Sequence, residues 1–445
     1  MIKWIKILLT GVLVSFFYFP FEFKFLPGIN TKMMLAAVGL VVLLYSWVRK
    51  REFAIPRELF FLLILSGVVS LVSLFSITYN QTPDTAYVSY IVSAAVWLSA
   101  AFTTCYIIYT VHGRLDITLL INYLTGVCVF QCIIAIAIDF NPSVMAFVDR
   151  FYVGGEYMRN LKRLYGIGAG LDVAGTRFSC VLICLSYLIA YRSDPLKNVQ
   201  MYLYFLSFAI ITVLGNMMAR TTVVGAVMGL LFMVFFGIIY SPSRERNGRA
   251  RLTGIIVTVL AAAIPMTVYY YRTNPEFYEL TRFAFEGFFS LAEKGEWEVA
   301  SNEMLKNMIV YPDEFKTWMI GDGYFLNQRY DPNYIGDATE GGFYMGTDIG
   351  YLRFIFYFGT IGLIAISAVM IYAGALCMKF HKDYSLMFFM ILVAGFIMWT
   401  KSATDIFVFF TFFICAYFVR LEEGDLDDEE EEEEEADDGL PTTVS

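Results

Sequence analysis

The sequence predicts an all-α polytopic integral membrane protein with about twelve transmembrane helices and a large extracytoplasmic loop between the ninth and the tenth. Hydrophobic residues make up 58% of the 445 residues, charged residues only 16%, and the mean hydropathy is +0.61. A bilayer core of roughly 30 Å needs about 20 apolar residues per helix, and such runs recur along the chain. The runs are continuous rather than alternating, which excludes a β-barrel.

The apolar runs give the order of the expected helices. We expect spans near 5–20, 31–48, 58–78, 86–111, 116–138, 173–191, 199–215, 221–240, 252–271, 350–376, 385–400 and 406–419. Short connections join most of them, and two longer segments remain, 139–172 and 272–349. Residues 1–420 therefore form one membrane-embedded domain.

Basic residues in alternate short connections predict the orientation. The connections that share one side carry Lys3, Lys6, Arg49, Lys50, Arg51, Arg57, Arg114, Arg192, Lys197, Arg244, Arg246, Arg249, Arg251, Lys379, Lys382 and Arg420. Cytoplasmic loops carry such an excess, so we expect both termini in the cytoplasm and the two longer segments outside. The first apolar run has no small-residue cleavage pattern, which favours a retained helix.

The last 25 residues differ sharply from the rest. Residues 422–438 hold 14 of the 41 acidic side chains, which leaves 27 acidic against 32 basic residues elsewhere, a net charge of +5. A block of like charges repels itself and cannot bury apolar surface. We expect 421–445 to be a disordered acidic cytoplasmic tail, solubilising in the simpler interpretation and partner-docking in the other.

Cysteine and histidine usage argues against a metal or a cofactor. All seven cysteines lie inside or at the ends of apolar runs, which implies packing residues rather than a disulfide framework. The two histidines, His112 and His381, fall on the expected cytoplasmic side. A Ser-His-Asp arrangement outside is therefore excluded, and nothing in the sequence indicates a nucleic-acid partner.

The expected outer edge collects cationic residues where few are expected. They are Arg163, Arg177, Arg220, Arg272, Arg353 and Lys401. A charge at membrane depth costs about 2.5–3.5 kcal/mol and usually faces the bundle interior or a wet cavity. Each one alone could be a snorkelling side chain. Several arginines converging on one cavity would instead suit a phosphate-rich ligand, because guanidinium binds phosphate oxygens bidentately.

The long outer segment has a pattern of its own. Residues 279–292 predict an interfacial or lid helix, and residues 296–310 predict a second amphipathic helix. Aromatic residues that could stack on sugar rings follow, although aromatics are also common at membrane interfaces. They are Trp297, Trp318, Tyr324, Tyr330, Tyr334 and Tyr344. The Gly-Asp-Gly at 321–323 follows no βαβ strand, so it is not a nucleotide loop.

Four segments, in this order, resemble the Wzy-type O-antigen and capsule polymerases and the related O-antigen ligases. They are RLYGIG (163–168) before Ala174, ARTTVVG (219–225), MLKNMIVYPDEFKTWMIGDGYF (304–325) and TDIGYLRFIFYFGTIGL (347–363). The layout resembles that superfamily over most of residues 1–420. Its ligases carry a histidine where this chain has Thr347-Asp348, which favours a polymerase. The ligases also place an arginine shortly before the tryptophan of the long loop. In this chain Lys294 precedes Trp297 instead, and Arg282 lies further from it.

The resemblance implies a metal-independent glycosyltransferase in the bacterial inner membrane, with its active site on the periplasmic face. Its substrates would be oligosaccharide repeat units linked to undecaprenyl diphosphate, and its partners a chain-length regulator and a flippase. Arg163 and Arg220 would bind the diphosphate, with Arg177 and Arg282 in support. A carboxylate would take the proton of the attacking hydroxyl, with Asp348 as the first candidate and Glu340 as the second. Supporting residues would be Lys401, Trp297 and Tyr351.

Other interpretations stay open at this stage. Asp348 could be a helix N-cap, and Lys401 could pair with Asp405 or orient loop carboxylates. A ligase that transfers glycan to lipid A core or protein has the same layout. A lipid-linked glycan flippase is disfavoured, because the centres of the spans are nearly free of charge.

Overall fold

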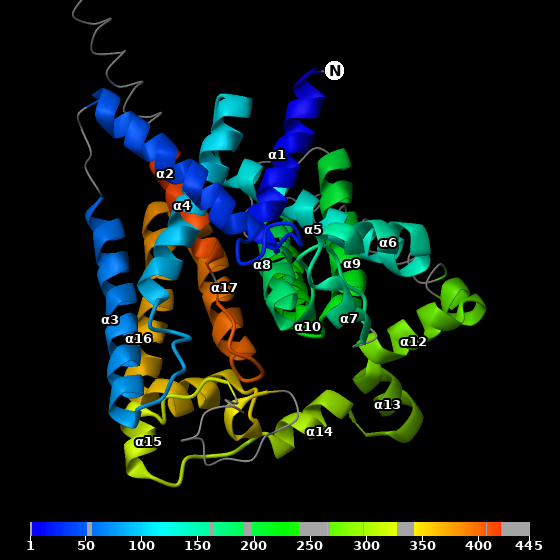
Figure 1. The fold of residues 1–445 in the computed structure, drawn as a ribbon. Coiled ribbons are helices and arrows are strands. Elements are labelled where there is room, and N and C mark those ends of the chain that lie inside the picture. Colours follow the sequence, from blue (N-terminus) through cyan, green and yellow to red (C-terminus); the bar gives the residue numbers. More distant parts are fainter. Residues whose placement is uncertain are drawn as a thin grey trace, which may run out of the picture.

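The computed structural model describes residues 2–50, 56–160, 163–190, 198–239, 265, 268–296, 298–326, 342–405 and 407–419. This part of the chain folds into helices and contains no β-strand, as the sequence predicts (Figure 1). Six of its helices are long and apolar enough to cross a membrane. They are α3 (Arg57–Asn80), α4 (Tyr90–His112), α5 (Ile117–Phe140), α8 (Leu171–Ala190), α9 (Asn198–Met218) and α16 (Gly350–Phe380).

Shorter helices complete the bundle and its loops. They are α1 (Ile2–Tyr18), α2 (Thr31–Lys50), α6 (Pro142–Phe151), α7 (Gly155–Asn160), α10 (Thr222–Phe232) with the π-helix η1 (Met233–Ile239), α12 (Pro275–Ala284), α13 (Glu286–Lys294), α14 (Ala300–Asn307), α15 (Phe315–Ile320), η2 (Tyr344–Gly346), η3 (Lys382–Tyr384), α17 (Ser385–Met398) and a last helix, Val408–Val419. The expected span at 252–271 lies mostly outside the described residues, so the twelve-helix arrangement stays a prediction. Trp297, Glu340 and the tail at 421–445 lie outside them too.

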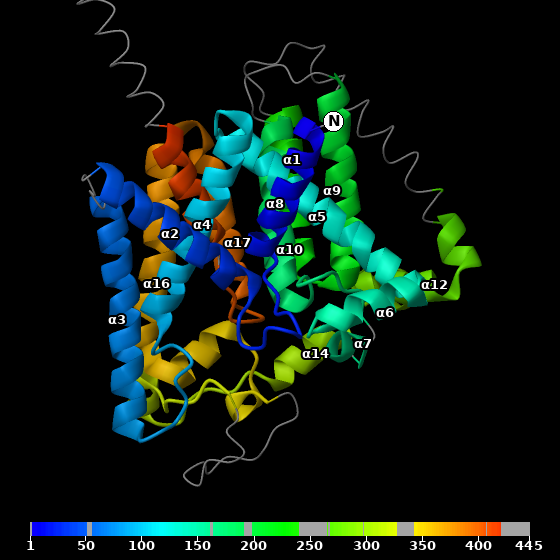
Figure 2. The ribbon, with the colours of Figure 1, turned by 45° about the horizontal axis from the view of Figure 1, so that its top comes forward.

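Helix α8 is the central helix of the bundle (Figure 2). It packs against α5, α9, α10 and α17, and almost all of its side chains are buried. Gly225 of α10 lies so close to it that an added Cβ would sit 2.2 Å from the Cα of Ser179. The Ser179 hydroxyl donates to the carbonyl of Thr221 at 3.1 Å and accepts from the Gly225 N–H at 3.1 Å. The turn between α9 and α10 is thereby fixed against the start of α8.

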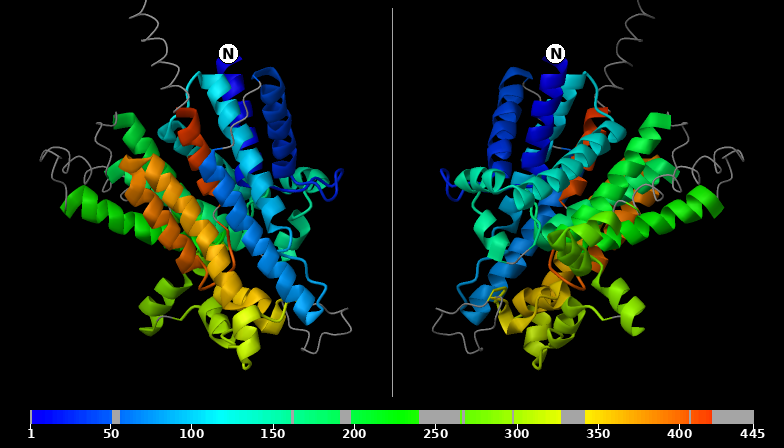
Figure 3. Two further views of the ribbon diagram at one scale, coloured as in Figure 1. Left: turned by 90° about the vertical axis from the view of Figure 1, so that its left-hand side faces the viewer. Right: turned by 90° about the vertical axis from the view of Figure 1, so that its right-hand side faces the viewer.

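Helix α16 is not the single straight span that residues 350–376 predict. Its backbone leaves helical geometry at Phe358 and Gly359, where Gly359 has φ +69° and ψ −173°. Figure 3 shows the short first part crossing the end of the bundle before the long second part runs along it. Only glycine adopts this backbone region readily, and α15 packs directly against the break.

The outer segment also differs from the prediction of one helix over 279–292. The chain forms α12 and α13 instead, with Phe285 between them at φ −118° and ψ 28°. The second predicted helix, 296–310, is shorter and spans Ala300–Asn307. All seven cysteines are buried and free, in agreement with their expected packing role.

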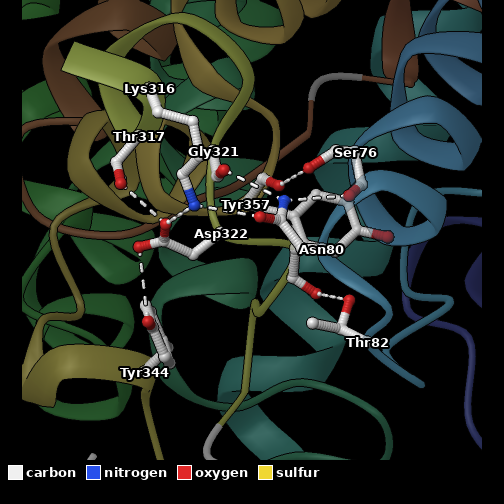
Figure 4. Close-up of polar contacts among 10 residues, drawn as sticks. Ser76, Asn80, Thr82, Lys316, Thr317, Gly321, Asp322, Tyr344 and Tyr357 are labelled. Atoms are coloured by element: carbon white, nitrogen blue, oxygen red, sulfur yellow. Dashed lines mark hydrogen bonds and ion pairs between the residues drawn. The ribbon is translucent and has the colours of Figure 1, made fainter. Parts of the chain in front are cut away.

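The Gly-Asp-Gly segment anchors the loop after α15 to the end of α3 (Figure 4). The Asp322 carboxylate accepts from Lys316 at 2.7 Å, from Thr317 at 2.6 Å and from Tyr344 at 3.3 Å. Lys316 also donates to Asn80 at 2.9 Å, and the Asn80 amide donates to the Gly321 carbonyl at 3.1 Å. We call these residues the loop clamp. A segment that matches no nucleotide loop thus has a structural role.

Replacing Asp322 with alanine should loosen the loop clamp. The carboxylate is about one-fifth exposed, and its loss leaves Thr317 without its acceptor and Lys316 with Asn80 alone. We expect a loss of about 1–3 kcal/mol of stability, measured by thermal unfolding, and faster proteolysis between α15 and α16. The exposed Asp313 supplies the control, because Asp313→Ala should change neither quantity. Equal proteolysis of the two variants would show that the clamp does not hold the loop.

Candidate functional site

The candidate site lies at one end of the bundle, where α8, α10 and α16 begin and α9 and α17 end. We call this the site end. Arg220 belongs to the three-residue turn between α9 and α10, which is closed by the Thr222 N–H donating to the Ala219 carbonyl at 3.0 Å. Asn216 donates to the Ala284 carbonyl at 2.6 Å and holds the α12–α13 junction over the turn. Arg220 therefore faces the outer segment rather than the lipid.

Arg163 and Arg220 converge, as the sequence predicts. The guanidinium of Arg220 lies 3.8 Å from the centroid of the Phe283 ring, and that of Arg163 lies 5.2 Å from the same centroid. Glu286 pairs with Arg220 at 2.9 Å. Burial lowers the pKa of Arg220, Glu286 opposes this shift, and the charge of Arg163 adds to it. Two cations beside one carboxylate leave a net positive charge, which favours an anionic ligand.

Asp172, which the sequence reasoning missed, connects this turn with the end of α17. Its carboxylate accepts from Lys401 at 2.8 Å and from the Thr221 hydroxyl at 3.2 Å. Of the roles left open for Lys401, pairing with Asp405 is wrong, because the ammonium pairs with Asp172. The sequence signal for Asp172 was its place in the first turn of an apolar span, where the helix N-terminus stabilises a carboxylate.

Asp348 forms an ion pair with Arg353 at 3.1 Å. The guanidinium of Arg353 lies 3.8 Å from the centroid of the Phe325 ring, and the side chain is only 8% exposed. The snorkelling interpretation of Arg353 is therefore wrong. The N-cap interpretation of Asp348 is also wrong, because Ile349 occupies the cap position of α16 and no side chain caps the helix.

The pKa of Asp348 is raised to about 6 because burial disfavours its charged form, while Arg353 opposes the shift and Asp172 adds to it. A carboxyl group whose folded pKa exceeds its unfolded pKa binds more protons in the folded state between the two values. Its contribution to stability therefore falls as the pH rises from about 4 to about 6. Thermal unfolding should show the wild type losing stability over this range relative to Asp348→Asn. A constant difference between the two proteins would contradict the shift.

A cavity of about 430 Å³ opens beside the Arg220 turn. Its polar end is formed by Arg220, Thr221, Glu286, Thr400 and Lys401. Its walls are apolar and come from α10, the α12–α13 junction, α14 and α17, with Val223, Val224, Val227, Phe283, Phe285, Phe288, Val299, Leu305, Ile397 and Met398. Val223 and Val227 are also exposed on the outside of α10. The cavity therefore joins a cationic end to an apolar surface of the bundle.

The other predicted residues lie elsewhere. Arg282 forms an exposed ion pair with Glu293 and does not line the cavity. Arg177 lies further along α8, beside a separate small cavity. The Tyr351 hydroxyl donates to the Phe396 carbonyl at 2.9 Å, which fixes the start of α16 to α17. Trp297 and Glu340 fall outside the described residues.

No protein-family model and no curated protein matches this chain. Its function therefore has to be inferred from the geometry of the site.

Proposed function

We propose that the protein joins oligosaccharide repeat units carried on undecaprenyl diphosphate into O-antigen or capsular polysaccharide. The single observation that carries the proposal is the cavity with a cationic end and apolar walls. A lipid diphosphate combines several negative charges with a long hydrocarbon chain. The cavity offers complementary surfaces for both parts in one place.

The cationic end suits the leaving group of such a reaction. Transfer of a glycan from a lipid diphosphate releases the diphosphate, and fixed positive charge stabilises the negative charge that develops on it. Arg220 and Lys401 line the cavity, and the guanidinium groups of Arg163 and Arg220 lie beside the same Phe283 ring. The Glu286 carboxylate pairs with Arg220 in the place that a phosphate oxygen would take, so the phosphate oxygen would replace it when the donor binds.

The size and surroundings of the cavity fit the lipid part. Its volume of about 430 Å³ lies within the range of roughly 300–1,000 Å³ that is usual for ligand sites. The exposed Val223, Val227 and Leu230 continue its apolar wall along α10, where a prenyl chain could follow the bundle surface.

The distribution of charge supports a periplasmic position of the site. The end of the bundle opposite the site end carries the basic residues Lys3, Lys6, Arg57, Arg114, Lys379 and Lys382. Because cytoplasmic loops carry such an excess, the proposal places the site end on the outer face of the inner membrane. The polymerases that the sequence resembles receive their lipid-linked repeat units on that face.

The glycan ladder of cells that lack the gene tests the proposal. A polymerase defect should leave single repeat units on the final anchor, and the wild-type gene should restore the ladder. Long polymer that accumulates on its lipid carrier would instead indicate a ligase. Complete loss of outward-facing repeat units would indicate a flippase, and an unchanged ladder would contradict all three.

A further inference from the structure

A second polar site lies deeper in the bundle than the cavity beside Arg220. The ammonium of Lys32, at the start of α2, lies 4.3 Å from the centroid of the Trp97 ring. The guanidinium of Arg177, on α8, lies 5.7 Å from the same centroid. Asp405, in the loop after α17, lines the same small cavity as Trp97 and Arg177. We call Lys32, Trp97, Arg177 and Asp405 the inner site.

The inner site encloses a cavity of about 20 Å³, lined by Trp97, Arg177 and Asp405 together with Tyr18, Thr176 and apolar neighbours. A single water needs about 10–15 Å³ measured in this way. The space therefore admits a water or one hydroxyl group of a larger ligand, but not a whole sugar ring. A hydroxyl that enters it would meet the carboxylate of Asp405.

Asp405 differs from the acidic residues that lie beside Arg220, Lys401 and Arg353. Asp172, Glu286 and Asp348 are each held in an ion pair, with Lys401, Arg220 and Arg353. Asp405 has no ion pair within 4.0 Å among the described residues. Burial of its carboxylate raises its pKa, while Arg177 and Lys32 oppose the shift, although the residue as a whole keeps an exposed surface.

Two chain segments fix the distance between the inner site and the cationic end of the large cavity. On α8, Asp172 contacts Lys401 and Thr221, and Arg177 follows five residues later. Five residues of α-helix rise about 7.5 Å, which leaves room for the anomeric carbon and an attacking hydroxyl between the diphosphate and a carboxylate. The loop after α17 bridges the same gap, since it carries Lys401 at one end and Asp405 near the other. A sugar attached to a diphosphate at Arg220 and Lys401 would thus have its anomeric carbon between the diphosphate and Asp405.

We propose that Asp405 is the proton acceptor for the attacking sugar hydroxyl, and that Lys32, Arg177 and Trp97 position the acceptor sugar. The inference rests on the proposed function. The acceptor oxygen forms a bond to the anomeric carbon of the donor. The bond between that carbon and the phosphate oxygen breaks, and its electron pair leaves with the lipid diphosphate. The hydroxyl proton passes to the Asp405 carboxylate and then to water. Asp348, the other candidate, is engaged by Arg353.

The experiment uses the full-length protein in lipid vesicles, with lipid-diphosphate-linked repeat units extracted from cells that lack the gene. Donor binding and repeat-unit transfer are measured separately for the wild type, Asp405→Asn, Asp348→Asn and Arg220→Ala. Asp383→Asn is the control, because Asp383 lies in η3 at the opposite end of the bundle. We expect Asp405→Asn to bind the donor normally and to transfer at least about 100-fold more slowly, the usual scale of general base catalysis. Asp348→Asn should keep most of the activity.

Transfer by Asp405→Asn at the wild-type rate, with Arg220→Ala inactive, would overturn the role of Asp405 and leave the proposed function intact. Absence of both donor binding and transfer in the wild type would overturn the proposed function itself. Asp405→Ala supplied with formate is the second test, because a small carboxylate can enter the space left by the side chain. Partial return of transfer supports the proposal, and no return in a variant that still binds the donor overturns it.

Discussion

Replacing Arg220 with alanine is expected to leave only single repeat units, with transfer lowered by about 100- to 1,000-fold. Arg220 lines the polar end of the large cavity, pairs with Glu286 at 2.9 Å and lies beside Arg163. Its loss removes positive charge where the departing diphosphate becomes more negative. The variant should still insert and fold, because the turn is held by backbone bonds and by Asn216 rather than by the guanidinium. The measurement is the glycan ladder in cells, together with donor binding to the purified protein.

Arg282→Ala is the matched control for this variant. Arg282 belongs to the outer segment that Arg220 faces, but it is paired with Glu293 on the surface and does not line the cavity. We expect a full ladder from it. Long polymer from Arg220→Ala, or equal defects in the two variants, would show that the cavity does not bind the diphosphate.

Replacing Gly359 with alanine is expected to cost about 3 kcal/mol or more of stability. Gly359 has φ +69° at the break in α16, a region that side chains rarely adopt. An added Cβ would also lie 2.1 Å from the carbonyl oxygen of Met319 on α15. The first part of α16 would have to move, and with it Arg353 and its partner Asp348. Thermal unfolding in detergent measures the loss.

Gly126→Ala is the control for the glycine substitution. Gly126 lies within α5, and an added Cβ there would meet nothing within 4 Å. Alanine is the better helix former by about 1 kcal/mol in soluble helices, so this variant should be at least as stable as the wild type. Equal unfolding temperatures for Gly359→Ala and the wild type would mean that α16 is not broken at this position.

The positions of the helices could be predicted because apolar runs of membrane length are strong signals. The ends of α3, α4, α5 and α9 lie close to the predicted bounds. The break in α16 could not be predicted, since a glycine in an apolar run is also compatible with a continuous helix. The separation of α12 from α13 depends on the contact of their junction with Asn216, which is remote in the sequence.

The candidate site was predictable in part. The resemblance implied that Arg163 and Arg220 bind one diphosphate, and the structure places both beside Phe283. Arg282 belongs to the long outer segment, yet its side chain pairs with Glu293 rather than lying beside the other two arginines. Asp172 was missed because a single acidic residue at a helix start is ordinary. Its partner Lys401 lies 229 positions away, and only the fold brings the two together.

Reconstitution from purified components tests the proposed polymerase activity itself. The purified protein in lipid vesicles would receive only lipid-diphosphate-linked repeat units, with neither lipid A core nor nucleotide sugar present. We expect products of two or more repeats on one lipid and the release of one lipid diphosphate for every new glycosidic bond. Unchanged single repeats, with no lipid diphosphate released by a protein that binds the donor, would contradict that activity.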